Sequence, residues 1–535
     1  MLFIIRCLFL SIFFLTGCNE KNIEPSNKQT VRISIGAEPQ SLDPRKVRDS
    51  ISTALMHMFF EGLTRFGKGG ELEMALAESV EISEDGLEYR FRLRKSLWSN
   101  GDPVTAFDFA ESWKTILDPR FPTDIASQLY DIKNARKAKL GEIALEQVGI
   151  TTPDAGTLVV ELETSVPYFL QLLSMPSFFP VHQKTAARDP QWALRVDAYV
   201  CNGPFVLKDW KHSDQITVVK NPTYWQAKDV ALHSIELCIM DSSTEIQMFE
   251  EGKLDWAGSP LSILPVDTIR TLKGKNILRS SPFSATYFFR VNTARQISDK
   301  KNPLSSPSFR KALAFAIDRK AITDHILQGG HKPAKGLVPP EMGLSELGYF
   351  QDDHPERAGA LLTDALLELD LTLSALEPIQ LSYKNDERNA SIAQAVQKQW
   401  EQVLGIKVAL EAVEPKIFFQ RVSQKEYQLA AGSWTADFDD PINFLEVFKY
   451  KETSANNTHW ENSKYVDLLT QSGICRDARE RRGLLRDAEQ ILMDEMPIIP
   501  IFHYILNFMQ SADLQEVALS PLGQIDFRWA HVEKR

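Results

Sequence analysis

A single apolar stretch at the start of the chain sets the strongest limit on how this sequence can fold. Residues 1–15 read MLFIIRCLFLSIFFL, with one arginine among them. This is short of the ~20 residues that a helix needs to span a bilayer, so the stretch fits a cleaved secretory signal better than a permanent membrane helix. No later apolar run reaches spanning length. We therefore expect the rest of the chain to fold as a body outside the cytoplasmic membrane.

The signal ends in Leu15-Thr16-Gly17-Cys18, which resembles the bacterial lipobox. In that motif the small residues admit the backbone to a peptidase, and the cysteine thiol is acylated. We expect a signal peptide over residues 1–17, lipidation at Cys18, and a polar, flexible tether over residues 18–30. The alternative is an ordinary signal peptide that happens to contain a cysteine.

The composition is that of a globular protein with several domains. The 535 residues are 43% hydrophobic and 24% charged, with a net charge of -11. At about 100–200 residues per domain, this length predicts about three domains. The acidic balance argues against a general nucleic-acid binder, which needs a basic face. The cysteines beyond residue 18 show no metal or disulfide spacing, so we expect buried thiols at Cys201, Cys238 and Cys475.

Strand and helix patterns follow one another along the body without a strict alternation. Residues 31–35 and 88–94 alternate apolar and polar side chains, as half-buried strands do. A capping-box pattern at 105–108 opens one helix, and Ser306-Pro307 opens another. Further helical patterns cover 356–369, 390–404 and 477–493, and short strand patterns lie near 380–383 and 408–411. Together they predict an α/β class with large mixed sheets.

Signatures of catalysis and of metal binding are missing from the sequence. It contains no G-x-x-x-x-G-K-[ST], G-x-G-x-x-G, G-x-S-x-G or H-E-x-x-H, and its ten histidines are scattered. We therefore expect a binding protein rather than an enzyme, with no catalytic residues, no metal and no cofactor.

Eight short segments occur in a fixed order along nearly the whole body: 38–44, 60–63, 98–109, 202–205, 221–225, 252–255, 309–319 and 436–437. The most specific is WSNGDPVTAFDF at 98–109, which is similar to the pattern W-x-[DN]-G-x-P-[VL]-T-A-x-D-F. In this order the segments resemble the extracytoplasmic solute-binding proteins of peptide ABC importers, the oligopeptide-binding protein family (solute-binding family 5).

The resemblance implies an α/β, two-lobed fold of the periplasmic-binding-protein type, with mixed sheets, a hinge and an extra domain on the first lobe. By position, the first lobe comprises residues 31–60, 183–282 and 503–535, the extra domain 61–182, and the second lobe 283–502. The chain then crosses between lobes near Pro282 and near Phe502. Closure around a ligand is expected to be a hinge motion.

The resemblance also implies function and partners. It predicts a monomeric receptor, held at the cell membrane by its N-terminal lipid, that delivers short peptides to ABC permease subunits and binds no nucleic acid. In a host with an outer membrane it would lie on the periplasmic side. Alternatives on the same fold are a receptor for cell-wall (muramyl-type) peptides, or for a metal chelate or haem, for which His503 is the candidate ligand. An extracytoplasmic hydrolase has least support.

The segment AAGSWTAD at 430–437 suits a site that grips a peptide backbone. Small residues allow close approach of the ligand, Trp434 offers a rigid apolar wall, and the resemblance gives Asp437 the role of pairing with the ligand α-amino group. An acidic turn before Pro441 and plain core packing of Trp434 are the alternatives. The predicted ligand-binding residues of this segment are Gly432, Ser433, Trp434, Thr435 and Asp437.

Departures from the family pattern bear on ligand choice. Ala431 stands where relatives often carry an arginine, and Thr435 where they often carry a disulfide cysteine. Arg290 stands where a relative can carry an acid, so we hypothesise a pocket that favours acidic side chains or a carboxylate, against a structural ion pair as the alternative. Tyr287 and Tyr504 complete the predicted site.

Overall fold

The computed structural model describes residues 29–47, 49–297, 300–453 and 455–533. The predicted signal peptide (1–17), Cys18 and the predicted tether up to residue 28 lie outside these residues. Thr30, which was expected to end the tether, is the first residue of a strand. Within the described ranges, no helix is both long and apolar enough to cross a membrane.

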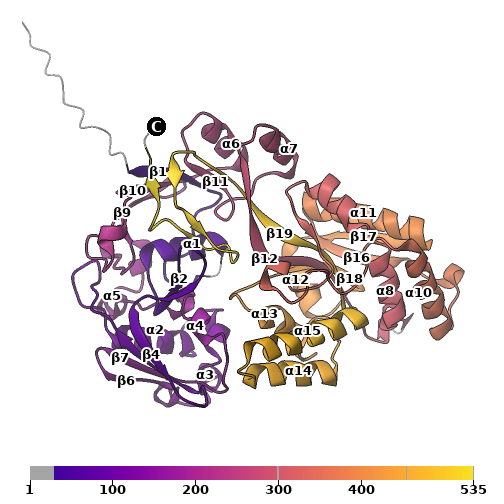
Figure 1. Ribbon diagram of the computed structural model, residues 1–535, viewed down its shortest axis with the longest axis horizontal. Coiled ribbons are helices and arrows are strands. Elements are labelled where there is room, and N and C mark those ends of the chain that lie inside the picture. Colours follow the sequence, from indigo (N-terminus) through magenta and orange to yellow (C-terminus); the bar gives the residue numbers. More distant parts are fainter. Residues whose placement is uncertain (1–28, 48, 298–299, 454, 534–535) are drawn as a thin grey trace, which may run out of the picture.

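One mixed sheet runs through both halves of the molecule. Its strands are β1 (Thr30–Ile35), β8 (Phe205–Lys211), β9 (Gln215–Lys220), β10 (Ser234–Ile239), β11 (Trp256–Gly258), β12 (Leu278–Val291), β15 (Lys332–Pro333), β16 (Ile379–Lys384), β17 (Val408–Val413), β18 (Leu429–Thr435) and β19 (Ile498–Gln510). The spatial order is β17-β16-β18-β12-β19-β11-β1-β10-β9-β8, with β15 beside β19. We call the side with β1 and β8–β11 the first lobe and the side with β16–β18 the second lobe (Figure 1).

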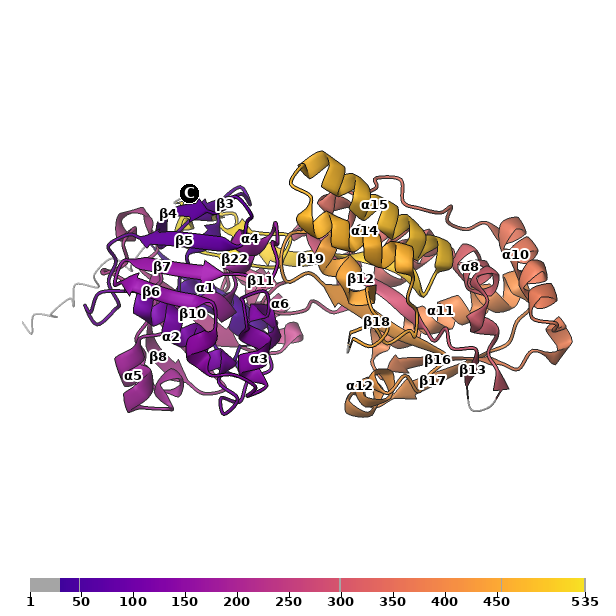
Figure 2. The ribbon, with the colours of Figure 1, turned by 90° about the horizontal axis from the view of Figure 1, so that it is seen from below.

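The two long strands β12 and β19 belong to both lobes. The first half of β12 pairs with the second half of β19, which also pairs with β11 in the first lobe. The second half of β12 pairs with β18 in the second lobe. The β12–β19 register shifts between Pro282 and Thr286, at the waist between the lobes that Figures 1 and 2 show.

A separate antiparallel sheet lies on the first lobe, with the order β4-β5-β7-β6. Its strands are β4 (Ala77–Ile82), β5 (Glu88–Leu93), β6 (Ile150–Asp154) and β7 (Thr157–Glu161), and helix α2 (Ala106–Leu117) packs on β6 and β7. The helix start predicted at 105–108 is confirmed: the Asp108 carboxylate accepts hydrogen bonds from the Thr105 N–H (2.8 Å) and hydroxyl (2.9 Å). Gly101 has the positive φ of 88° that its Asn-Gly turn requires.

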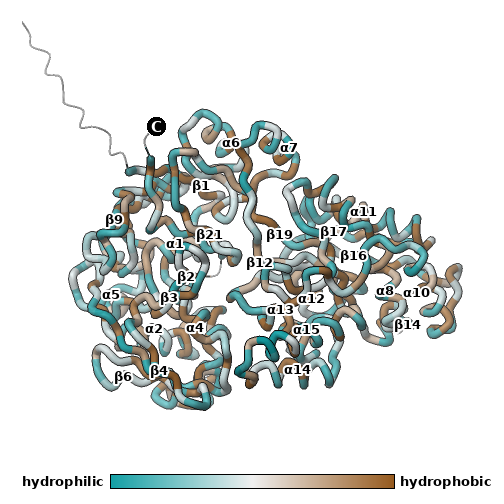
Figure 3. Tube along the Cα trace, viewed as in Figure 1, coloured by the Kyte–Doolittle hydropathy of each residue, from teal (hydrophilic) through white to brown (hydrophobic). Residues whose placement is uncertain are grey.

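The helices cover the sheets, with hydrophobic and hydrophilic residues alternating along their turns in Figure 3. The start predicted at Ser306-Pro307 is confirmed, since the Ser306 hydroxyl accepts from the Phe309 N–H at 3.4 Å. First-lobe helices are α1 (Ser50–Phe59), α3 (Ala135–Lys139), α4 (Phe169–Leu172), α5 (Gln183–Arg188), α6 (Ser242–Glu250) and α7 (Val266–Gly274). Second-lobe helices are α8 (Pro307–Phe315), α9 (Arg319–Ala321), α10 (Pro355–Glu368), α11 (Glu387–Leu404), α12 (Pro415–Ser423), α13 (Ile442–Leu445), α14 (Ser463–Ile474) and α15 (Ala478–Glu495).

The described residues also form four two-stranded sheets: β2 (Thr64–Phe66) with β3 (Leu72–Met74), β13 (Gln296–Ile297) with β14 (Lys300–Lys301), β20 (Leu514–Gln515) with β23 (His531–Val532), and β21 (Ala518–Leu519) with β22 (Ile525–Asp526). The α/β class with mixed sheets that the sequence predicts is confirmed. The predicted segment boundaries, at 60, 182, 282 and 502, stay predictions.

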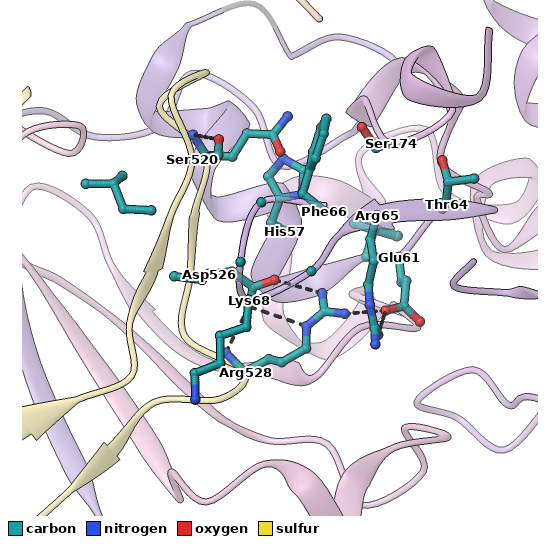
Figure 4. Close-up of a pocket in the computed structure, with 18 of the residues that line it drawn as sticks. His57, Glu61, Thr64, Arg65, Phe66, Lys68, Ser174, Ser520, Asp526 and Arg528 are labelled. Atoms are coloured by element: carbon teal, nitrogen blue, oxygen red, sulfur yellow. Dashed lines mark hydrogen bonds and ion pairs between the residues drawn. The ribbon is translucent and has the colours of Figure 1, made fainter. Parts of the chain in front are cut away.

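A buried charge network ties the two ends of the chain together in the first lobe (Figure 4). Glu61, 1% exposed, accepts hydrogen bonds from Arg65 (2.8 Å) and from Arg528, which also pairs with Asp526 (3.0 Å). Burial alone raises the pKa of Glu61, but the two arginines overcome this effect and hold that pKa below its ordinary value. Glu61, in the segment 60–63 that resembles the family pattern, thus has a role in packing inside this lobe.

The described cysteines are free thiols, as the spacing indicates, but their burial differs from the expectation. Cys201 is buried, and burial raises its pKa to about 12. Cys238 and Cys475 are only half-buried. The prediction of three buried thiols is thus right for one of them.

Candidate ligand-binding site

Two neighbouring cavities lie along β18, between the lobes. The interlobe cavity, of about 670 Å³, is lined by Thr435, Ala436 and Asp437 from the second lobe and by Phe283 and Leu506 from the crossing strands. Its first-lobe wall includes Ser50, Thr53, Asp124, Gln128, Ser177, Ser259 and Gln524. The strand-edge cavity, of about 540 Å³, is lined by residues 431–433, by Tyr287, Arg290 and Tyr504, and by parts of α11 and α12.

Along the cavities, β18 has an unpaired backbone edge. The Ala436 N–H donates to the Ser284 carbonyl at 2.8 Å, which makes this a hydrogen-bonded pair of the antiparallel β12–β18 ladder. Because such pairs alternate with non-bonded ones, the amide groups of Ser433 and Thr435 point to the opposite edge. At that edge β16 pairs with residues 429–430 of β18 and leaves these two positions open in the described chain. An extended ligand can add there as a further strand.

Asp437 lies just beyond this edge and faces the interlobe cavity. Its N–H donates to the Asn443 side-chain oxygen at 3.4 Å, which fixes the backbone. Within the described residues its carboxylate has no hydrogen-bond donor and no cation at ion-pair distance. The walls of the cleft raise the pKa of Asp437 by desolvation, although its side chain is open to solvent within the cleft. A positively charged ligand group is what this carboxylate lacks.

Arg290 lies against the backbone of Gly432. A Cβ at position 432 would come within 1.6 Å of the Arg290 Nη1 atom, so the missing side chain of the glycine makes room for the guanidinium. Arg290 is half-buried, lines the strand-edge cavity and lies 5.1 Å from the ring centre of Phe288. No carboxylate among the described residues forms an ion pair with it, which argues against the structural ion pair that was its alternative role. Burial lowers the pKa of Arg290.

The two predicted tyrosines, Tyr287 and Tyr504, line the strand-edge cavity. The Tyr287 ring stacks on Phe502 with 5.0 Å between ring centres, and its hydroxyl donates to Asn389 at 2.6 Å. Tyr504 hydrogen-bonds to the side chains of Ser433 and Arg388. Both rings are therefore held in place before any ligand arrives.

Trp434 and His503 lie outside the linings of both cavities. Trp434 is half-buried, and its indole N–H donates to the Asn443 side-chain oxygen at 2.8 Å, so it supports the turn that carries Asp437. His503 is 4% exposed and its Nδ1 shares a hydrogen bond with the Thr286 hydroxyl at 2.8 Å. Burial lowers the pKa of His503 to about 4. It is not free to bind a chelated metal, and no metal-binding cluster occurs within the described residues.

The structure thus brings Tyr287, Arg290, Gly432, Ser433 and Tyr504 to one cavity and Thr435 and Asp437 to the next. Sequence reasoning missed the first-lobe wall, because its serines, threonine and glutamine carry no pattern that separates them from surface loops. It also missed a contact across the cleft, where Tyr168 beside α4 stacks on Phe438 with 4.3 Å between ring centres.

Comparisons with known proteins agree with this architecture. The model of "Bacterial extracellular solute-binding proteins, family 5 Middle" matches residues 71–456. The oligopeptide-binding protein OppA of Bacillus subtilis is 39% identical over 96% of this chain and 95% of its own length. The chain belongs to the bacterial extracellular solute-binding proteins of family 5. It is a solute-binding protein and not an enzyme, as its sequence predicts.

Solved structures of this family share the two-lobed fold. The unliganded open form of the murein tripeptide-binding protein MppA is similar with a TM-score of 0.79 and 26% identity, over 95% of this chain and 98% of its own. OppA of Listeria monocytogenes, bound to a peptide, gives a TM-score of 0.74 and 27% identity, over 95% and 100%. The predicted two-lobed fold is confirmed.

Proposed function

We propose that this protein is a lipid-anchored receptor that captures short peptides between its lobes and delivers them to an ABC-type peptide permease. The observation that carries the proposal is the open edge at Ser433 and Thr435, which ends at the unpaired carboxylate of Asp437. A backbone edge beside a lone carboxylate matches an extended peptide with a free amine. The relatives named as oligopeptide-binding proteins support the same ligand class.

The predicted residues that line the two cavities each have a role in this proposal. Ser433 and Thr435 bind the ligand backbone, and Gly432 lets the ligand and Arg290 come close to the strand. Asp437 pairs with the ligand ammonium group, a charge-assisted contact of about 1.5–3 kcal/mol. Tyr287 and Tyr504 shape the cavity beyond the edge.

The lobes close by bending where the chain crosses between them, near Pro282 and near Phe502. In this proposal the first lobe comprises residues 31–60, 183–282 and 503–535, the extra domain 61–182, and the second lobe 283–502. The register shift of β12–β19 between Pro282 and Thr286 supports a hinge there, because broken pairing bends more easily than a regular ladder. Cleavage before Cys18 and lipidation of its thiol place the monomer on the outer face of the cell membrane.

A receptor for cell-wall peptides is the second candidate, and Arg290 favours it, because such peptides carry extra carboxylates. Purification of residues 29–535 from bacteria, followed by mass spectrometry of the bound material, separates the two. Mixed short peptides support the first proposal and muramyl-type peptides the second. A preparation that holds a metal chelate, or that hydrolyses added peptides, overturns both.

The amine anchor is tested with one peptide in two forms, with a free and with an acetylated N-terminus. Wild-type protein should lose about tenfold to a hundredfold in affinity on acetylation, which is the ~1.5–3 kcal/mol of the lost contact. Asp437→Asn should bind the free peptide more weakly by ~2–5 kcal/mol and should barely distinguish the two forms. Asp439→Asn, the same change two residues away, is the matched control. If Asp437→Asn keeps full affinity and full discrimination, Asp437 is not the anchor.

A further inference from the structure

The strand-edge cavity carries an excess of positive charge. Its lining includes Arg290, Lys384 and Arg388 against Asp386 and Glu387. Asp386 is already engaged, since it pairs with Lys384 at 3.3 Å and accepts from the Asn389 side chain at 2.7 Å. Arg388 hydrogen-bonds to Tyr504. Of the three cations, Arg290 is the one for which the described residues provide neither a carboxylate nor a hydrogen-bond acceptor.

A half-buried guanidinium without a nearby anion is unfavourable in free energy, unless a ligand supplies the anion. Removing a cation from water is unfavourable, and a planar carboxylate is the group that an arginine fork binds best, through two parallel hydrogen bonds. Gly432 provides the passage by which the guanidinium reaches across β18 toward its open edge. One further part of the lining is apolar, with Phe418, Phe419 and Val422 of α12.

We infer that Arg290 forms a carboxylate-binding subsite, which takes an acidic side chain or the terminal carboxylate of the ligand at about the fourth or fifth residue from its amine. This inference rests on the proposed function and adds to it a substrate class, peptides that carry an anionic group at a fixed distance from the anchor.

The position follows from the register of the strand. Arg290 lies at Gly432, five residues before the amine anchor Asp437. A ligand whose amine meets Asp437 and that runs along the edge toward Gly432 is antiparallel to β18, with about one ligand residue per strand residue at ~3.3 Å. Its first residue then lies near 435 or 436, and its fourth or fifth lies opposite 432.

The test uses seven-residue alanine peptides with a free amine and an amidated C-terminus, in which one glutamate or one glutamine is placed at each of positions 2–6. Calorimetry on wild-type protein should give about tenfold or tighter binding for glutamate over glutamine at position 4 or 5. A second arm compares free-acid and amidated peptides of four and five residues, and so separates a terminal carboxylate from a side chain. Arg290→Gln should abolish either preference, and Arg290→Lys should keep part of it.

Arg120→Gln is the matched control, because that arginine is 88% exposed and contacts only Asp118 among the described residues. It should keep the preference, which excludes an effect of net charge alone. If wild-type protein binds the peptides but shows no preference in either arm, or if the preference survives in folded Arg290→Gln, the subsite is wrong and peptide binding stands. If no peptide binds, the proposed function fails first.

Discussion

Gly432→Ala places a methyl group where the structure puts the guanidinium of Arg290. The new Cβ would lie 1.6 Å from Nη1 and 2.6 Å from Cζ, against the ~3.5–4 Å of an ordinary contact, so the guanidinium must move by roughly 2 Å. The strand backbone itself accepts alanine, because Gly432 does not have a positive φ, and the loss of a flexible glycine stabilises by about 0.4–1 kcal/mol. The charge of Arg290 is unchanged.

A displacement of ~2 Å is enough to break a charge-assisted hydrogen bond, which is worth about 1.5–3 kcal/mol. We therefore expect Gly432→Ala to lose about tenfold to a hundredfold of its preference for a glutamate over a glutamine peptide, with a melting temperature close to that of wild type. Calorimetry with the matched peptides and thermal unfolding measure the two quantities. If the preference for glutamate over glutamine is unchanged, Arg290 does not contact the acidic group of the ligand. A collapse in melting temperature would show that the Arg290–Gly432 contact is core packing instead.

Three further predictions concern titration and lobe motion. Burial raises the pKa of Asp437, and the ligand ammonium group needs its charged carboxylate. Peptide affinity should therefore fall by about tenfold per pH unit below that pKa, and the fall should begin at a higher pH than for an ordinary aspartate. Asp437→Asn should remove this pH dependence. Burial raises the pKa of Glu489 to about 7 against its hydrogen bonds from Leu337, Val338 and Tyr349. The folded state therefore binds the proton more tightly than the unfolded one. As pH rises from 5 to 8, the free energy of unfolding of the wild type should fall by about 2.5 kcal/mol relative to that of Glu489→Gln; an equal pH dependence of the two would contradict this reasoning. Tyr168→Ala removes a stack of about 0.5–1.5 kcal/mol across the cleft, and a larger radius of gyration of the ligand-free protein in small-angle scattering is expected.

The sequence predicts those parts of the fold that depend on neighbours along the chain. The helix starts at Thr105 and at Ser306 follow from hydrogen bonds between a side chain and a backbone N–H three residues away. The alternation of apolar and polar residues at 88–94 places Tyr89 and Phe91 in the core, because successive side chains of a strand point to opposite faces. These features need no knowledge of the rest of the structure.

Contacts between distant residues escaped prediction because nothing local marks them. Glu61 meets Arg528, which is 467 residues away, and each alone reads as a surface charge. Within the site, the residue types of 430–437 indicated a peptide edge, but only the structure shows that Trp434 supports the turn while its neighbours line the cavities. His503 was a candidate for metal binding until its hydrogen bond with Thr286 and its burial were visible.

The pairing of β19 with β11 has a consequence for the synthesis of this chain. Trp256 and Gln510 are paired neighbours in the sheet, and the Gln29 side chain donates a hydrogen bond to the backbone carbonyl of Val532, 503 residues away. A ribosome that adds about 5–20 residues per second takes roughly half a minute or more to make 535 residues. For almost all of that time the first lobe lacks β19, the strand that pairs with β11. The first lobe therefore cannot complete its fold during synthesis, and the nascent chain can still pass through a translocation channel.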